Sequence, residues 1–148
     1  MTYLLILFVV ALALAPLSHF LPSKSQRKTA RLREYAALSG LFVEFRDIPG
    51  AALAPRPHAP VIYYGKRLRP ARGKSSDACA WVFSGQGWQS VGSRRSTPHA
   101  LDQLVVDVLA VGADEFSCGI YWTESAGEDA IDQIVEFLEQ WSVTLVEE

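Results

Sequence analysis

The sequence predicts an α+β protein: an N-terminal transmembrane helix followed by a small, mostly antiparallel sheet with helices packed on one face. Three observations lead to this prediction. The chain opens on a long uncharged apolar run, several short runs rich in β-branched and aromatic residues follow, and other segments repeat apolar residues at helical spacing. We divide the chain into a transmembrane anchor (residues 1–22), a basic juxtamembrane helix (residues 23–40) and a cytosolic α+β domain (residues 41–148).

The first segment is long enough to cross a lipid bilayer. Nineteen residues from Tyr3 to Leu21 carry no charge, and as a helix rising about 1.5 Å per residue they would span about 28 Å. A secretory signal peptide would carry basic residues before its apolar stretch, and here none precedes Leu4. A pattern typical of cleavage sites ends at Ala15, but the apolar run continues beyond it. We therefore expect the segment to stay in the membrane.

Positive charge follows the apolar run directly. Five basic residues lie within a dozen residues of its end: Lys24, Arg27, Lys28, Arg31 and Arg33. By the positive-inside rule, the C-terminal side of the anchor is cytoplasmic. We expect a single pass through the cell inner membrane, with the N-terminus outside and the C-terminal domain in the cytoplasm. Lys24, Arg27, Lys28 and Arg31 are candidate contacts with anionic lipid headgroups or a protein partner.

Charge is distributed unevenly beyond the anchor. All 14 Lys and Arg lie at or before Arg95, whereas residues 96–148 carry 12 Asp and Glu and no basic residue. The two parts therefore have net charges of +10 and −12. Two interpretations stay open. The two parts can pack together and neutralise one another, or the basic side can face an anionic membrane while the acidic side faces the cytosol or a partner.

The first elements of the cytosolic part follow from local signals. Ser23 or Ser25 can cap a helix that ends at Gly40, a residue suited to the left-handed position after a helix. Residues 41–48 have the composition of a β-strand. Residues 49–60 contain four prolines and are predicted to form an extended loop.

The middle of the chain is predicted to supply most of the sheet. Residues 61–65 read as a second strand, and residues 66–77 as a polar loop. Residues 78–84 and 88–91 are strands that flank the glycine-rich turn at residues 85–87, so they should form a hairpin.

Two helices and one strand are predicted after this hairpin. Thr97 and Pro98 can begin a helix that ends before Gly112 and carries one apolar face, formed by Leu101, Leu104, Val105, Val108 and Leu109. A strand with one strongly buried side then follows, with this side formed by Phe116, Cys118, Ile120 and Trp122. Residues 125–141 have the charge pattern and periodicity of a second helix, and residues 143–148 can add a strand or fray.

No catalytic or cofactor motif is found in the sequence. The G-x-S-x-G elbow, the phosphate loop that ends in Gly-Lys-Ser/Thr and the H-E-x-x-H zinc motif are all missing. Cys79, Cys118, His58 and His99 lack the close pair spacing of structural zinc sites, so neither a metal nor another cofactor is predicted. In a reducing cytosol we expect Cys79 and Cys118 to be buried thiols without a disulfide. Whether the domain is an enzyme stays uncertain, and the sequence favours a non-enzymatic protein.

The densest positive charge of the domain lies after the second predicted strand. Five basic residues occur within nine positions: Lys66, Arg67, Arg69, Arg72 and Lys74. They lie near aromatic residues, a combination that nucleic-acid binders also use, although nucleic acid is the least expected ligand here. A solvated loop is one interpretation, and contact with anionic lipid headgroups or a protein partner is the other.

The plan of the first 40 residues, with one apolar span and a basic helix that begins "SKSQRK", resembles small single-pass inner-membrane proteins of bacteria. Among these it is similar to the YajC accessory subunit of the Sec preprotein translocase. The tryptophan-rich domain beyond residue 40 does not follow that family's short basic β-domain.

The expected function is that of a membrane-anchored, non-enzymatic interaction or accessory protein, which enters the bilayer through residues 3–21 and docks on or regulates an inner-membrane complex. The alternatives are a small membrane-associated enzyme with an unrecognised site and, as the resemblance implies, a translocase-accessory-like subunit.

Overall fold

The structure is a computed structural model, and it describes residues 1–15, 22–69, 78–92, 96–104 and 106–147. The chain falls into two compact units, Met1–Arg31 and Leu32–Glu148, which are treated separately here.

The first unit contains α1 (Thr2–Leu14) and the beginning of α2 (Lys24–Leu38). In α1 no residue is buried, and large apolar side chains are exposed all along the helix. Among the residues that the structure describes, no helix has both the length and the apolar character that a membrane crossing requires. Residues 16–21 of the expected anchor lie outside the described residues. The transmembrane helix therefore stays a prediction.

Helix α2 begins and ends where the sequence predicts. At its start, Gln26 donates its backbone N–H to Ser23 Oγ (3.2 Å), and Ser23 donates its backbone N–H to Gln26 Oε1 (2.8 Å), which is a reciprocal capping box. At its end, Gly40 adopts a φ of +84°, and the Leu41 N–H donates to the carbonyl of Ala36 (3.0 Å). This Schellman arrangement satisfies the last carbonyls and turns the chain into the sheet.

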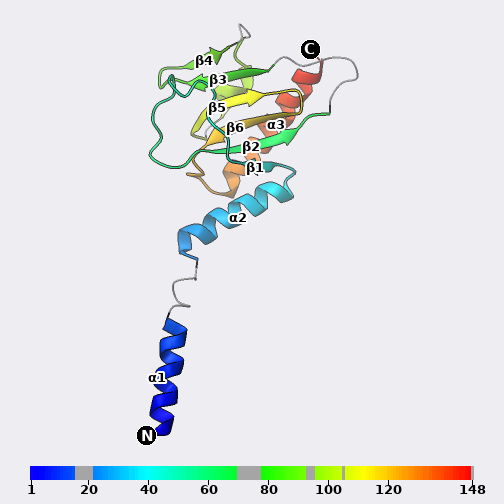
Figure 1. Cartoon of the computed structure of the whole chain (residues 1–148). Coiled ribbons are helices and arrows are strands. Elements are labelled where there is room, and N and C mark those ends of the chain that lie inside the picture. Colours follow the sequence, from blue (N-terminus) through cyan, green and yellow to red (C-terminus); the bar gives the residue numbers. More distant parts are fainter. Residues whose placement is uncertain (16–21, 70–77, 93–95, 105, 148) are drawn as a thin grey trace. The chain divides into compact units, whose positions relative to one another are not determined.

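The second unit is built on a six-stranded sheet in which every neighbouring pair is antiparallel (Figure 1). Its order is β1-β2-β6-β5-β3-β4. The strands are β1 (Phe42–Glu44), β2 (Ile62–Arg67), β3 (Cys79–Phe83), β4 (Trp88–Val91), β5 (Val108–Ala113) and β6 (Ser117–Trp122). A short 3-10 helix, η2 (His99–Gln103), precedes β5, and α3 (Glu128–Glu147) ends the chain. These elements confirm the predicted α+β class and the β3–β4 hairpin.

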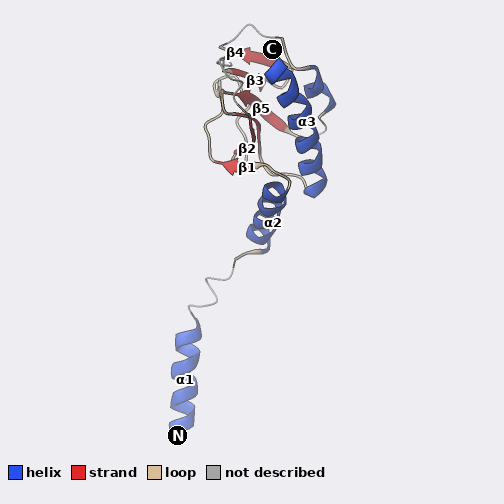
Figure 2. Cartoon of the chain, turned by 90° about the vertical axis from the view of Figure 1, so that its right-hand side faces the viewer, coloured by secondary structure: helices blue, strands red, loops and turns tan. Residues whose placement is uncertain are grey.

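The sheet is covered on both faces. Figure 2 shows α3 along one face, where buried residues of α2, α3 and the strands form the main core. On the opposite face, a smaller cluster contains Tyr63, Val82, Ala110 and Tyr121. The residues packed against it are Phe42, Ile48, Ala54 of the proline-rich segment, Val61 and Val91. All six residues of β6 are therefore buried. The predicted buried side of this strand is confirmed at Cys118, Ile120 and Trp122. The other side is buried as well, because residues before and within the proline-rich segment, such as Ile48 and Ala54, pack against the cluster that contains Tyr121.

Paired glycines cross the centre of the sheet. Gly119 of β6 lies opposite Gly65 of β2 and Gly112 of β5. A side-chain carbon added at Gly119 would meet the Tyr63 ring at 2.4 Å and the Tyr64 carbonyl oxygen at 2.5 Å. Because these glycines have no side chain, the Tyr63 ring can lie directly against the backbone of the sheet.

The predicted helix over residues 97–109 was wrong. Among the described residues of this stretch, only the short 3-10 turn of η2 is helical, and the residues from Val108 onward make strand β5 at the centre of the sheet. The apolar residues that match helical spacing serve separate elements: Leu101 is buried in η2, whereas Val108 is buried and Leu109 half-buried in β5. Between β3 and β6 this segment buries residues on both of its faces, whereas a surface helix would bury only one face.

Three further boundaries differ from the prediction. Strand β2 continues through Lys66 and Arg67, which were predicted to belong to the polar loop. The first strand is limited to Phe42–Glu44, and Phe45 already lies outside it with an exposed side chain. At the other end of the chain, α3 continues to Glu147 instead of giving way to a strand. Leu138, Trp141 and Leu145 are all buried, so the apolar stripe of α3 extends one turn beyond the predicted end.

Candidate functional site

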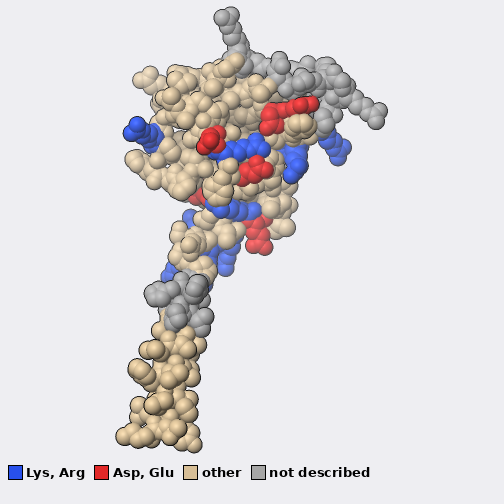
Figure 3. Space-filling model, in the orientation of Figure 1, with Lys and Arg blue, Asp and Glu red and all other residues tan. Residues whose placement is uncertain are grey.

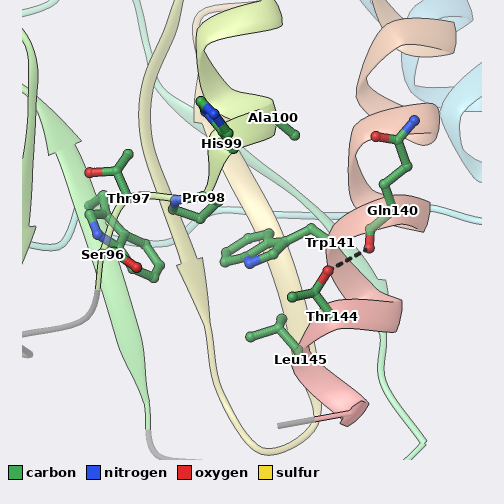
Figure 4. Close-up of a pocket in the computed structure, with 10 residues that line it drawn as sticks. Ser96, Thr97, Pro98, His99, Ala100, Gln140, Trp141, Thr144 and Leu145 are labelled. Carbon is green, nitrogen blue, oxygen red and sulfur yellow. Dashed lines mark hydrogen bonds between the residues drawn. The ribbon is translucent and has the colours of Figure 1, made fainter.

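A hollow of about 1110 Å³ opens between α3 and the segment that leads into η2. Figure 4 shows Gln140, Trp141, Thr144 and Leu145 on the α3 side, with Trp141 pointing toward the segment of Thr97 and Pro98. Ser96, His99 and Ala100 also line the hollow.

Aromatic residues form one wall of this hollow. The buried rings of Trp81 and Trp141 meet edge to face, with centroids 6.0 Å apart. The polar side chains among the other described lining residues offer hydroxyl and amide groups, together with the imidazole of His99. The hollow therefore suits a neutral ligand that packs on an indole and takes hydrogen bonds, and its described lining does not hold the pair of groups that acid–base catalysis uses.

A partly buried ion pair fastens the second half of α2 to the sheet. Arg33 Nε donates to Glu124 Oε1 at 2.7 Å, and Arg33 Nη2 donates to Glu124 Oε2 at 2.8 Å. Tyr64 Oη donates a third hydrogen bond to Glu124 Oε1 at 2.7 Å. Burial, with this bond to the Glu124 carboxylate, raises the pKa of the Tyr64 phenol, so Tyr64 stays a proton donor. Close by, Tyr35 Oη of α2 donates to Asp132 Oδ1 of α3 at 2.8 Å.

Backbone strain accompanies this ion pair. Glu124 adopts a φ of +54°, in the left-handed region that non-glycine residues rarely occupy. Its side chain is only 9% exposed, against 34% for Arg33. The bond to Glu124 raises the pKa of the Arg33 guanidinium against the opposing effect of burial. Because Glu124 uses both carboxylate oxygens to hold α2, we interpret this cluster as a structural clasp.

A second group of arginines stacks on aromatic rings near β1. The Arg46 guanidinium carbon lies 4.2 Å from the centroid of the Tyr63 ring, and the Arg67 guanidinium carbon lies 5.4 Å from that of Phe42. Arg46 also pairs with Glu44 at 2.7 Å and with Asp114 at 3.4 Å. Its charge is therefore largely satisfied within the domain, whereas Arg67 is exposed.

Within the part of the chain that the structure describes, ion pairs join the basic first part to the acidic last part at three points: Arg33–Glu124, Arg46–Asp114 and Lys66–Glu139. These contacts support the interpretation that the two parts neutralise one another locally. The Lys66 Nζ atom lies 3.2 Å from Glu139 Oε1 of α3, so this candidate lipid contact is already engaged within the domain.

The structure places seven of the nine basic candidate residues. In the first unit, Lys24, Arg27, Lys28 and Arg31 are all exposed on α2. In the second unit, Lys66, Arg67 and Arg69 lie together where β2 ends. Figure 3 shows basic side chains gathered at the right-hand edge, where β2 ends in Figure 1. Arg72 and Lys74 lie outside the described residues.

Both cysteines are buried, as predicted, and neither is in a disulfide. Burial raises the pKa of the Cys118 thiol to about 12, so this sulfur stays protonated and weakly nucleophilic at neutral pH. No three His, Cys, Asp or Glu side chains within the described ranges are arranged to hold a metal ion.

Two residues of these sites were missed by sequence reasoning. Phe116 was assigned to the buried side of its strand, but it is 63% exposed. Its position directly after Asp114-Glu115 was the available signal for a turn. Glu124 was not singled out, and nothing in the sequence pairs it with a residue 91 positions away.

Comparisons with known proteins do not assign the chain to a family. No protein-family model, no curated protein and no solved structure matches the chain.

Proposed function

We propose that the chain is a membrane-anchored, non-enzymatic interaction protein. Its N-terminal segment holds it in the cell inner membrane with the N-terminus outside, and its α+β domain docks on or regulates a membrane complex from the cytoplasmic side. The observation that carries this proposal is the surface of α1. Its leucine, isoleucine, valine and phenylalanine side chains are exposed along the whole helix, without a charge to hold them in water.

A helix that is apolar on all sides needs an apolar environment. The uncharged sequence continues to Leu21, and exposed Lys24, Arg27, Lys28 and Arg31 follow it. An apolar segment followed by basic residues supports an orientation in which the basic residues stay on the cytoplasmic side. There, each cation near the anionic leaflet contributes about 1 kcal/mol of binding free energy.

Substitutions within α1 test the proposal. The double variant Leu7→Lys/Val10→Lys places two charges in the middle of the apolar run, which costs about 2.5 to 3.5 kcal/mol for each lysine in a membrane helix. After cell fractionation and an alkaline carbonate wash, we expect the wild-type chain in the membrane pellet and the lysine variant in the supernatant. The control Leu7→Ala/Val10→Ala should stay in the pellet. Release of the wild-type chain by the wash would contradict an integral anchor.

A further inference from the structure

An exposed aromatic side chain caps the turn between β5 and β6. Phe116 is 63% exposed, although the six residues that follow it in β6 are all buried. Single exposed apolar residues are common on protein surfaces. Whether the exposed Phe116 ring marks a binding surface therefore depends on the residues around it.

The turn that carries Phe116 is firmly held. Asp114 Oδ1 accepts the backbone N–H groups of Phe116 at 2.8 Å and Ser117 at 2.7 Å. The carbonyl of Phe116 accepts the N–H of Leu68 at 2.8 Å, which extends the ladder beyond the end of β2. Asp114 is further held by Arg46, 3.4 Å away. The ring of Phe116 is thus presented to solvent by a fixed backbone and not by a loose loop.

Basic and apolar residues at the end of β2 and directly after it lie next to this turn. Arg67 lies opposite Ser117 in the ladder, so Leu68 lies beside Phe116. Leu68 packs against the main core, whereas Arg67 and Arg69 on either side of it are exposed. We call Arg67, Leu68, Arg69 and Phe116 the hairpin-tip patch. The patch also adjoins the exposed carboxylate of Glu115, which its two guanidinium groups outnumber.

We propose that the hairpin-tip patch is a second membrane contact, in which Phe116 enters the interface of an anionic leaflet while Arg67 and Arg69 bind lipid phosphates. This inference rests on the proposed membrane anchor and adds to it a defined lipid-facing surface of the domain. Aromatic rings favour the headgroup region, where one apolar side chain can be buried without carrying polar backbone into the hydrocarbon. The guanidinium fork binds phosphate with two parallel hydrogen bonds.

An anionic lipid surface fits the patch better than a groove on a protein partner. The patch offers one exposed ring and two exposed cations at the same hairpin tip, which matches a soft interface lined with many phosphates. An anchor also keeps the domain at a high effective concentration beside the membrane, so that a weak contact becomes populated.

Fluorescence of the full chain in lipid nanodiscs tests the inference. We place an environment-sensitive dye at Phe116→Cys and, as a control, at Gln86→Cys, which is exposed in the β3–β4 turn at the tip of another hairpin of the same sheet. The parent chain, treated identically, reports any labelling of the buried native thiols. Discs contain phosphatidylcholine alone or mixed with phosphatidylglycerol, and some carry a quencher in the headgroup region.

In anionic discs we expect a blue shift and strong quenching at position 116, and neither at position 86. Both signals should be lost with Arg67→Gln/Arg69→Gln, in phosphatidylcholine discs, and in 1 M salt, where the screening length is about 3 Å. Lys66 stays unchanged in this variant because it pairs with Glu139.

Other outcomes separate this inference from the anchor. Equal signals at positions 116 and 86 in anionic discs would overturn the lipid contact while leaving the anchor intact. A blue shift at position 116 that appears only when a solubilised membrane-protein fraction is added would have the same meaning, because it would indicate a protein partner. A chain that does not co-elute with discs would contradict the anchor. In that case, the fluorescence of the chain labelled at position 116 is measured with anionic vesicles added in solution. The absence of a blue shift there would overturn the lipid contact as well.

Discussion

The glycine at the centre of the sheet provides a sharp stability test. In Gly119→Ala, the new methyl carbon would lie 2.4 Å from Tyr63 Cζ and 2.5 Å from the Tyr64 carbonyl oxygen. The second of these is a backbone atom of the neighbouring strand, so the clash cannot be relieved by rotating one side chain. The Tyr63 ring is itself 1% exposed and shares a hydrogen bond with Ser117 Oγ at 3.3 Å.

Overpacking in a well-packed core costs about 1 to 3 kcal/mol. Because Gly119→Ala displaces both a backbone carbonyl and a buried ring, we expect a loss of about 3 kcal/mol in the free energy of unfolding. Gly112→Ala is the matched control, in the next strand and directly opposite. Its nearest new contact would be 3.7 Å, so we expect a change within about 1 kcal/mol, with either sign.

Urea unfolding followed by tryptophan fluorescence measures both variants, since all four tryptophans belong to the domain. Full chains in the same detergent are compared, so that the N-terminal helix contributes equally. Equal stability of the two variants would refute the close approach of Tyr63 and β2 to Gly119.

Two other predictions concern the clasp and the buried thiol. Glu124→Gln removes the charge partner of Arg33, and because the Arg33 side chain is 34% exposed we expect a loss of about 1 to 2 kcal/mol, less than for a fully buried pair. Glu115→Gln, a change at an exposed turn residue, should alter urea stability by less than about 0.5 kcal/mol, and an equal effect of both would contradict the clasp. Burial raises the pKa of Cys118 to about 12, so the native state keeps a proton that the unfolded chain releases above about pH 8.5. Its contribution to stability is complete below about pH 8.5 and is lost as pH rises toward 12, so Cys118→Ala should flatten the fall in urea stability between about pH 8.5 and 10. An unchanged slope, or fast alkylation of Cys118 in the native chain at pH 7.5, would contradict this burial.

Local sequence signals located the elements whose stability is encoded nearby. Helix α2 begins at the Ser23 cap and ends at Gly40, and the predicted apolar stripe of α3 is buried at Ile131, Ile134 and Leu138. The prediction for β5 failed because its apolar residues happen to match helical spacing as well. Its true partners in β3 and β6 are visible only once the sheet is assembled.

The candidate site shows the same division between local and long-range information. The exposed basic residues Arg67 and Arg69, at the end of β2 and directly after it, follow from composition, and the sequence identified them. The engagement of Lys66 by Glu139, 73 positions later, depends on how α3 crosses the sheet. The exposure of Phe116 depends on where β6 begins, because a shift of one residue decides whether an apolar side chain joins the core or faces solvent.

The most direct test of the central claim is the topology of the intact chain in cells. Reporters fused after Glu148 distinguish the two sides of the membrane. Alkaline phosphatase is active only outside the cytoplasm. Green fluorescent protein fluoresces only if it stays in the cytoplasm, because it does not fold after export in unfolded form. We expect the membrane fraction to contain the full-length fusion with a fluorescent, phosphatase-inactive C-terminus, because positive charge follows the apolar run. Active phosphatase after Glu148, or a mature chain that begins near Pro16, would contradict the account.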